Sequence, residues 1–288
     1  MAREGQSVLF VCFNKALRAY LAERHPIKGV DYFTFHGLCT RLARVAGVAL
    51  PKFKKGEAPP PEYFEDELPL ALIDATKKLG GQYDSILVDE AQDLHNHWLE
   101  ALMTTLRDED EGSVWLFMDD NQRVYDAVLE VPKEFTPFDL PVNCRNTQAI
   151  HREVLKLYKG AVTPSAIGPK GRQPEFMAAK DQAKAVADVL EYLCVKEGVP
   201  PQDVVVLSSH SPRGSKVYRD MHGRFEWTDK LGELGDKVFF SSIRAFKGLE
   251  SPVVVLCEPE DLDDMSREQQ LYVGISRAKN HCVVIAPA

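Results

Sequence analysis

The chain has 288 residues, of which 44% are hydrophobic and 27% charged, with a formal net charge of −8. This hydrophobic content excludes an intrinsically disordered chain. No apolar run reaches the roughly 18 residues that a membrane span needs, and the first residues do not form a signal peptide. We therefore expect a globular cytoplasmic protein of about two domains, with no membrane partner. The six cysteines form no CxxC pair and are expected to be free thiols.

Strands and helices alternate through the first half of the chain. Short apolar runs predict strands at 7–13, 30–35, 84–88 and 113–118. Amphipathic stretches between them predict helices at 14–24, 36–46, 62–79 and 96–107. This alternation is typical of a parallel sheet covered by helices. We assign residues 1–135 to a first domain, with a small insertion at about 40–83.

The same rhythm resumes after a proline-containing boundary at 132–141. Helices are predicted at 146–158, 180–197 and 265–279, and strands at 204–208, 238–242, 253–257 and 282–286. Residues 136–288 therefore form a second domain. The predicted fold class is α/β, with two parallel-sheet domains.

Carboxylates follow the strand at 84–88 directly, in the sequence DEAQD at 89–93. Ligands of parallel sheets bind beyond the carboxyl ends of the strands. Asp89 is therefore placed to hold a magnesium ion, and Glu90 to orient or deprotonate a water. The alternative is an acidic loop at a sheet edge, which the complete DEAQD sequence makes less attractive.

Four further positions suit phosphate and sugar chemistry. Gln122 follows the strand at 113–118 and could sense a terminal phosphate. Arg145 and Arg277 offer fixed guanidinium groups for charge that develops on a transferring phosphoryl group. Glu250, in the KGLE turn, could accept a ribose hydroxyl. Taken singly, each arginine is more typical of a surface or ion-paired residue, and KGLE of a plain turn.

Seven segments in this order resemble the motor core of the UvrD/Rep-like superfamily 1 DNA helicases. They are FVCFNKALRAYL (10–21), TFHGLC (34–39), LVDEAQD (87–93), DDNQRVY (119–125), LPVNCRNTQAI (140–150), SSIRAFKGLESPVVVL (241–256) and LYVGISRAKN (271–280). The resemblance covers nearly the whole chain. It implies two RecA-like domains of the P-loop NTPase helicase core, which use ATP and Mg²⁺ and move along single-stranded DNA, in the 3′ to 5′ direction.

The resemblance also implies a role for each matching residue. It assigns magnesium to Asp89, water activation to Glu90, the terminal phosphate to Gln122, and arginine fingers to Arg145 and Arg277. Glu250 would bind the sugar. The remaining nucleotide-site residues are Gln92, Lys247 and Gly248. The strand of DNA would contact Phe13, Asn14, Thr34, Phe35, His36 and Ser242, by stacking and backbone contacts.

Three departures from the family pattern matter. The phosphate loop GxxxxGK[ST] is missing, and residues 2–6 look like the tail of the helix that normally follows it. We therefore expect an N-terminally truncated chain whose first domain lacks its opening strand and phosphate loop, and which cannot hydrolyse ATP alone. A partner or a missing N-terminal segment would supply the loop. Cys144 and Arg244 replace the family's usual tyrosine and histidine.

A non-catalytic module that binds single-stranded DNA, or a fragment without independent function, remains the alternative. The charge distribution does not exclude DNA. Residues 1–60 carry a net charge of +6, residues 61–139 of −15 and residues 140–288 of +1. The basic first segment contains most of the DNA-contact motifs, so we expect salt-sensitive binding of modest affinity.

Overall fold

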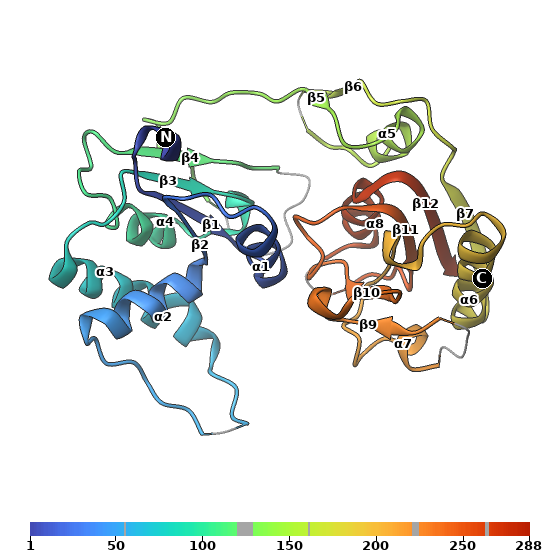
Figure 1. Cartoon of the computed structure of the whole chain (residues 1–288), viewed down its shortest axis with the longest axis horizontal. Helices are drawn as coiled ribbons and strands as arrows, with labels where there is room; N and C mark the ends of the chain where they lie inside the picture. The colour runs from blue at the N-terminus through green and yellow to red at the C-terminus, as the bar shows by residue number, and fades with distance from the viewer. Residues whose placement is uncertain (55, 120–128, 161, 221–224, 263–264) are drawn as a thin grey trace. The chain divides into compact units, whose positions relative to one another are not determined.

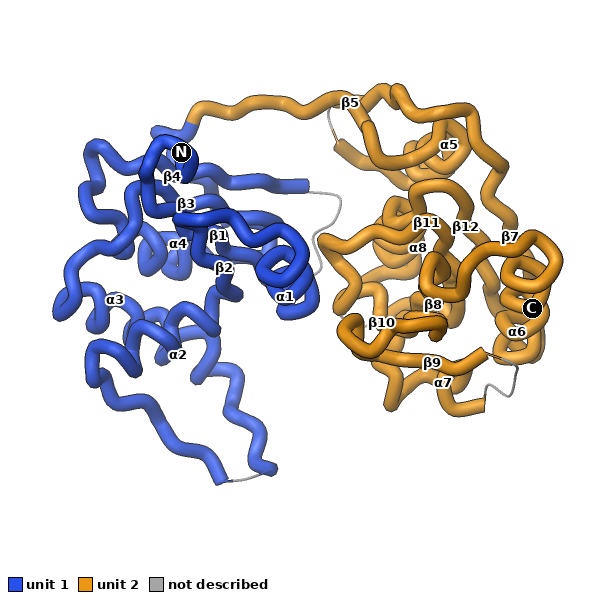
Figure 2. The backbone as a smooth tube through the Cα atoms, in the orientation of Figure 1, with its two compact units in different colours: residues 1–119, 126–135 blue, residues 120–125, 136–288 orange. Residues whose placement is uncertain are grey.

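The computed structural model describes the chain except residues 55, 120–128, 161, 221–224 and 263–264. The described residues divide into two compact units, which part between Phe135 and Thr136 (Figure 2). Each unit has its own parallel β-sheet flanked by helices (Figure 1). This confirms the predicted α/β class.

The described part of unit 1 holds a four-stranded sheet in the order β2-β1-β3-β4, with all neighbours parallel. Its core combines the buried faces of the strands with apolar side chains of α2, α3 and α4. The strands are β1 (Val8–Cys12), β2 (Val30–Thr34), β3 (Ser85–Val88) and β4 (Ser113–Leu116), and the helices are α1 (Lys15–Arg24), α2 (Phe35–Ala46), α3 (Leu68–Leu79) and α4 (Asn96–Met103).

The first two helices each begin with a side-chain N-cap, directly after the strand that precedes the helix. The Asn14 side chain accepts a hydrogen bond from the Ala16 amide at 2.7 Å, and α1 follows. The Thr34 hydroxyl accepts one from the Gly37 amide at 3.2 Å, and α2 follows. Both strand-to-helix turns therefore lie at the carboxyl edge of the sheet, where the sequence places two of its motifs.

The predicted helix at 62–79 is interrupted. A π-helical turn spans Tyr63–Glu67, and α3 begins at Leu68. The Glu65 carbonyl in this turn accepts hydrogen bonds from Trp98 Nε1 at 2.9 Å and from the His97 ring at 2.6 Å. These tertiary contacts with α4 favour the wider turn over a continuous α-helix.

The described part of unit 2 holds a six-stranded sheet in the order β7-β12-β11-β8-β10-β9, again with all neighbours parallel. A separate pair, β5 (Val142–Asn143) and β6 (Ser165–Ala166), precedes it. The strands are β7 (Glu175–Ala179), β8 (Val204–Ser208), β9 (Trp227–Thr228), β10 (Val238–Ser242), β11 (Ser251–Cys257) and β12 (Ala278–Pro287), and the helices are α5 (Gln148–Leu155), α6 (Gln182–Leu190), α7 (Lys216–Asp220) and α8 (Arg267–Ser276).

In unit 2 one helix prediction is wrong at its carboxyl end, and another helix changes type within its predicted range. The helix predicted to run to 279 ends at Ser276, because Ala278 already pairs with Ser251 of the neighbouring strand. The last strand therefore begins four residues earlier than predicted. The helix predicted at 180–197 divides into α6 and a π-helical turn at Glu191–Lys196.

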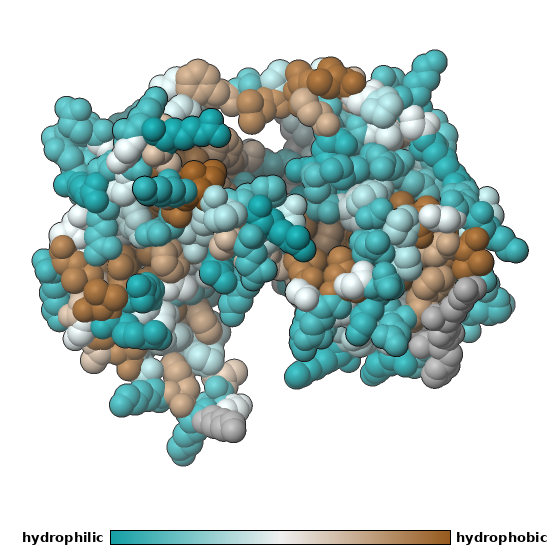
Figure 3. Space-filling view, in the orientation of Figure 1, coloured by the Kyte–Doolittle hydropathy of each residue, from teal (hydrophilic) through white to brown (hydrophobic). Residues whose placement is uncertain are grey.

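The surface is mostly hydrophilic on the face that Figure 3 presents, with apolar side chains gathered over α3. Leu70 of that helix is 61% exposed. Within the described residues, no helix combines the length and the apolar character needed to cross a membrane.

Candidate functional site

The carboxyl ends of the strands in unit 1 bring two predicted motifs to one edge of the sheet. β1 lies between β2 and β3, and Val11 pairs with Val88. The Asp89 amide donates to the Val11 carbonyl at 2.8 Å. Asp89 therefore lies beside the end of β1, next to the segment that begins with Phe13 and Asn14.

Glu90 adopts a left-handed backbone conformation with φ of 56°. Such conformations are uncommon outside glycine and concentrate at functional sites. Its carboxylate accepts a hydrogen bond from Gln92 Nε2 at 2.6 Å. The other end of the Gln92 amide accepts one from the Asp119 backbone at 3.1 Å, and Gln92 is fully buried. A buried amide thus fixes the orientation of the Glu90 carboxylate.

The donor set at this edge fits a magnesium ion that keeps most of its own waters. Asp89 and Glu90 are adjacent carboxylates, and Mg²⁺ is commonly held by one or two carboxylates together with water and phosphate oxygens. No group of three or more His, Cys, Asp or Glu side chains gathers for a metal within the described residues. The edge therefore does not offer an all-protein metal cage.

The Cys12 thiol is buried close enough to Asp89 to feel its charge, and it donates to the carbonyls of Asn14 at 3.5 Å and Phe33 at 3.8 Å. Burial, reinforced by the negative charge of Asp89, raises the pKa of Cys12 to about 12. The thiol therefore stays protonated at neutral pH.

The predicted DNA-contact residues of unit 1 differ in accessibility. Thr34 caps α2 and is 8% exposed, and Phe35 is 2% exposed. The Phe35 ring stacks on Trp98 with 4.8 Å between ring centroids, so in this structure it packs in the core. Phe13, Asn14 and His36 are partly exposed and could meet a ligand.

The second strand-end motif of unit 1 is described only in part. β4 ends at Leu116, and the Phe117 amide donates to the Val88 carbonyl at 2.9 Å. Asp119 is the last described residue of the motif. Gln122, predicted to contact the terminal phosphate, lies outside the described residues.

In unit 2 the structure brings Arg145 and Glu250 together. Arg145 Nε donates to Glu250 Oε2 at 2.8 Å, and Lys279 Nζ lies 3.0 Å from Glu250 Oε1. The Arg145 amide itself donates to the Asn143 side chain at 3.0 Å, which holds the turn. Both oxygens of the Glu250 carboxylate are therefore engaged by cations.

Burial opposes ionisation of Glu250, but Lys279 and Arg145 outweigh it and hold the pKa of this carboxyl below its ordinary value. Glu250 is thus a carboxylate at neutral pH. A ligand that uses Arg145 or Glu250 must compete with this ion pair. Lys279 was not predicted, and its only signal in the sequence is a cation two residues after Arg277.

Arg277 is 1% exposed and lies in the turn between α8 and β12. Its Nε donates to the Val273 carbonyl at 3.3 Å. Asn146, which the sequence analysis did not single out, donates through Nδ2 to the carbonyls on both sides, Ser276 at 3.0 Å and Ala278 at 2.6 Å. Asn146 therefore ties the turn that carries Arg145 to the turn that carries Arg277.

The KGLE segment joins β10 to β11. Ser242 ends β10, and its hydroxyl accepts a hydrogen bond from the Ala245 amide at 3.1 Å. Lys247 is 4% exposed, and Gly248 has a φ of 80°, a conformation that favours glycine. The segment therefore turns sharply before Glu250, which places that carboxylate at the amino end of β11.

A second carboxylate in unit 2 was missed by the sequence analysis. Glu258 follows β11 in a left-handed conformation with φ of 52° and is 8% exposed. It accepts hydrogen bonds from Ser208 Oγ at 2.5 Å, Ser215 Oγ at 2.6 Å, and the amides of Lys216 at 2.8 Å and Val217 at 3.1 Å. This carboxylate joins the ends of β8 and β11 to the start of α7.

Comparisons with known proteins bear on part of unit 2. No curated protein matches the chain in sequence. Among solved structures, the PRRSV helicase is similar with a TM-score of 0.43 and 14% sequence identity, over 99% of this chain and 54% of that one. The chain thus spans about half the length of that helicase, and a likeness at this level carries no argument about function. Residues 237–285, which include Glu250 and Arg277, match the family model of the UvrD-like helicase C-terminal domain.

Proposed function

We propose that the chain carries the motor core of an ATP-dependent DNA helicase or translocase that acts on single-stranded DNA. The observation that carries this proposal is the meeting of Arg145, Glu250 and the Arg277 turn in unit 2, within and beside the segment that matches the UvrD-like helicase C-terminal domain. The Arg145 guanidinium pairs with a carboxylate in this structure, and the same group could pair with a phosphate in place of that carboxylate when a nucleotide binds.

The roles are those that the family resemblance implies for the matching residues. Asp89 holds magnesium, and Glu90, oriented by Gln92, takes the proton of the attacking water. Bound Mg²⁺ supplies the charge that offsets the phosphate oxygens. Arg145 is the first arginine to test as the finger, because Arg277 is buried. Glu250 binds the sugar, beside Lys247 and Gly248, and Gln122 contacts the terminal phosphate.

The 288 residues on their own bind ATP weakly and do not hydrolyse it, because their sequence contains no GxxxxGK[ST] loop. The test is steady-state ATP hydrolysis by the purified chain with and without single-stranded DNA. We expect background rates in both conditions. DNA-stimulated turnover that is lost in Glu90→Gln would contradict this expectation and would support the catalytic role of Glu90.

The missing loop also favours a second function, a non-catalytic module that binds single-stranded DNA or completes a partner. Fluorescence anisotropy with a labelled oligo-dT strand at low salt tests the part shared by both functions. We expect binding that weakens as salt rises. No binding at low salt would exclude both DNA functions.

A matched pair of variants tests the DNA face of unit 1. Phe13→Ala should weaken binding of oligo-dT about tenfold, the loss expected from one stacking contact. Tyr20→Ala removes an aromatic ring that is 44% exposed on α1 but has no predicted DNA contact, and should leave affinity unchanged. Equal losses in both variants would contradict the assignment of Phe13.

The 3′ to 5′ direction is proposed from the family resemblance alone. It is tested by displacement of streptavidin from strands that carry biotin at either end. The preparation must contain whatever supplies the phosphate loop, so that ATP is hydrolysed. Faster displacement from the 3′ end would contradict the proposed direction.

A further inference from the structure

The turn that carries Arg145 in unit 2 is held by a network of polar side chains. Its members are Asn143 at the end of β5, Asn146 in the turn and His151 of α5. Asn146 is 2% exposed and His151 is 5% exposed. Asn143 Oδ1 accepts hydrogen bonds from the amides of Arg145 at 3.0 Å and Asn146 at 3.1 Å. The conformation of the turn therefore depends on the direction in which the Asn143 side-chain amide points.

The contacts of the Asn143 amide fix its direction. Two backbone N–H groups donate to one of its atoms, so that atom is the oxygen and the other is the nitrogen. The nitrogen donates to Asn146 Oδ1 at 2.7 Å and to His151 Nδ1 at 3.1 Å. Asn146 presents its oxygen there because its own nitrogen donates to the carbonyls of Ser276 and Ala278. Both N–H groups of the Asn143 side chain are therefore used.

The His151 ring is held in a single neutral tautomer. Its Nδ1 accepts from Asn143, so the proton of the ring lies on Nε2. The other end of the ring requires the same tautomer, because Nε2 lies 3.0 Å from the Pro164 carbonyl, which can only accept. Pro164 directly precedes β6, and Ala166 of β6 pairs with Asn143. The ring thus joins α5 to both strands of the β5–β6 pair.

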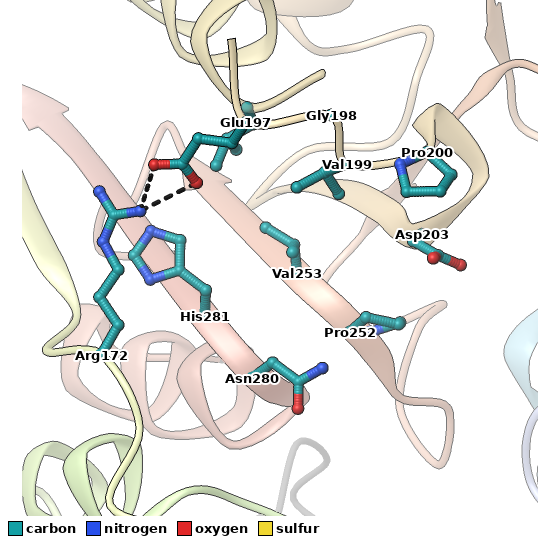
Figure 4. A pocket seen from close by; sticks show the side chains of 11 residues that line it. Arg172, Glu197, Gly198, Val199, Pro200, Asp203, Pro252, Val253, Asn280 and His281 are labelled. Atoms are coloured by element: carbon teal, nitrogen blue, oxygen red, sulfur yellow. Dashed lines mark hydrogen bonds and ion pairs between the residues drawn. The ribbon is translucent and has the colours of Figure 1, made fainter. Parts of the chain in front are cut away.

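Burial alone does not impose such contacts on a histidine of this unit. His281 of β12 is 6% exposed and lies beside Arg172 at a cavity of about 310 Å³ (Figure 4). Neither of its ring nitrogens has a hydrogen-bond partner among the described residues. The two bonds of the His151 ring are therefore a specific feature of the Arg145 turn.

We propose that His151 is a positioning residue for Arg145 and acts through Asn143. The ring nitrogen fixes the Asn143 amide, the amide oxygen fixes the turn, and Arg145 Nε then meets Glu250 at 2.8 Å. An arginine that is already in place loses less conformational freedom when it binds an anion. That this anion is a phosphate rests on the function proposed above, whereas the relay from His151 to the turn does not.

Two variants separate the two bonds of the ring. His151→Asn places an amide oxygen near the position of Nδ1, so it keeps an acceptor for Asn143 and loses the donor to Pro164. His151→Gln reaches the position of Nε2, so it keeps the donor to Pro164 and loses the acceptor for Asn143. Each variant gives up one hydrogen bond, and only His151→Gln cuts the relay to Arg145.

Hydrogen exchange of the backbone amides, followed by NMR in the full chain, measures the turn directly. In His151→Gln the amides of Arg145 and Asn146 should exchange about fivefold faster than in the natural chain, as for the loss of one hydrogen bond. His151→Asn should restore the natural rates. The Lys216 amide, which Glu258 holds at 2.8 Å, reports general loosening of the unit and should respond equally in both variants. Equal exchange of the Arg145 amide in the two variants would overturn the proposal.

The natural chain provides a test that depends on no variant. A 15N–15N coupling between Asn143 Nδ2 and His151 Nδ1, transmitted across their hydrogen bond, should be resolved, with the ring proton on Nε2. A ring that carries its proton on Nδ1 cannot accept from Asn143 and would overturn the proposal.

Binding of tripolyphosphate, a phosphate probe without a sugar, tests the consequence for Arg145. His151→Gln should weaken binding about threefold, the cost of ordering one side chain, and His151→Asn should not. His151→Gln should have no further effect once Arg145→Ala is present, and a loss that persists there would overturn the positioning role. If amide exchange responds as expected but Arg145→Ala leaves tripolyphosphate binding unchanged, the relay is supported and the phosphate role of Arg145 fails instead.

Discussion

Single buried polar side chains hold the turns that carry the candidate site of unit 2. Asn146 is 2% exposed and donates to two carbonyls, at 3.0 and 2.6 Å, that flank Arg277. Glu258 accepts four hydrogen bonds where two strands and a helix meet. Neither residue performs the proposed chemistry. Their loss should therefore appear first in the stability of unit 2.

Asn146→Ala leaves the carbonyls of Ser276 and Ala278 buried without their donor. We expect a loss of about 2 to 4 kcal/mol in the free energy of unfolding, because each unpaired buried group costs about 1–3 kcal/mol. Urea denaturation measures the loss. The control Asn280→Ala removes an exposed amide from the same unit and should change stability by less than about 0.5 kcal/mol. Equal effects of the two variants would contradict the bridging role of Asn146.

The ion pair between Arg145 and Glu250 predicts a gain in phosphate affinity when the carboxylate is neutralised. Tripolyphosphate is a suitable probe because it has no sugar for Glu250 to bind. Glu250→Gln should bind it about two- to fivefold more tightly than the natural chain, since a competing, partly exposed charge pair is worth at most about 1 kcal/mol.

Two control variants accompany the tripolyphosphate experiment. Arg145→Ala should weaken tripolyphosphate binding whether or not Glu250 is changed. Glu268→Gln opens a comparable surface ion pair, with Lys159 at 2.9 Å, and should have no effect. If Glu250→Gln and Glu268→Gln raise affinity equally, general charge and not the Arg145 pair explains the gain.

At the scale of elements, the alternation of strands and helices predicted the class of both sheets, because period and turn residues are local properties of the sequence. The ends of elements depend on partners that are distant in the chain. The last strand starts at Ala278 because Ser251 pairs with it. The segment Tyr63–Glu67 forms a π-helical turn because Trp98 donates a hydrogen bond to the Glu65 carbonyl. No local pattern contains this information.

The candidate site shows the same division between local and distant information. The carboxylates at the end of β3 could be placed from the strand that precedes them. The pairing of Arg145 with Glu250 spans 105 positions and could not be predicted. Phe35, expected to face DNA, packs in the core because Trp98 supplies a stacking surface.

His36 couples the π-helical turn to α2. Its ring packs against Phe35, Phe64 and Trp98 and bonds to the Phe64 carbonyl at 3.1 Å. Burial lowers the pKa of His36 from its ordinary value of 6.5 to about 4. The unfolded chain therefore takes up this proton at a higher pH than the folded chain does. The stability that the neutral ring contributes is fully present above pH 6.5 and is lost as the pH falls towards 4.

We expect His36→Phe to remove this part of the pH dependence. Between pH 7 and pH 5 the natural chain should lose about 2 kcal/mol more than the variant, as the linkage relation gives for such a shift. Urea midpoints followed by tryptophan fluorescence at the two pH values measure the difference. The control His25→Phe changes an exposed histidine on the same unit and should keep the pH dependence of the natural chain. If it flattens the dependence as much as His36→Phe, His36 is not its cause.

At the scale of the whole molecule, the net charge of −8 arises from residues 61–139, and two groups of these acidic residues lie at opposite ends of the unit 1 strands. Asp89 and Glu90 follow the carboxyl end of β3. The exposed turn at 108–111 precedes the amino end of β4, which pairs with β3 in parallel. A strand of four residues is about 13 Å long, so the two acidic groups are separated by more than the Debye length of about 10 Å at 0.1 M salt.

This separation predicts a salt-dependent effect of the acidic turn. The combined variant D108N/E109Q/D110N/E111Q should bind oligo-dT more tightly than the natural chain at about 0.02 M salt, where the Debye length exceeds the strand, and equally at 0.15 M. Neutralising Asp89 and Glu90 instead, at the edge where we propose DNA and magnesium bind, should raise affinity in magnesium-free buffer at both salt concentrations. An effect of the acidic turn that persists at 0.15 M salt would place DNA near the amino end of the sheet and overturn the proposed DNA face.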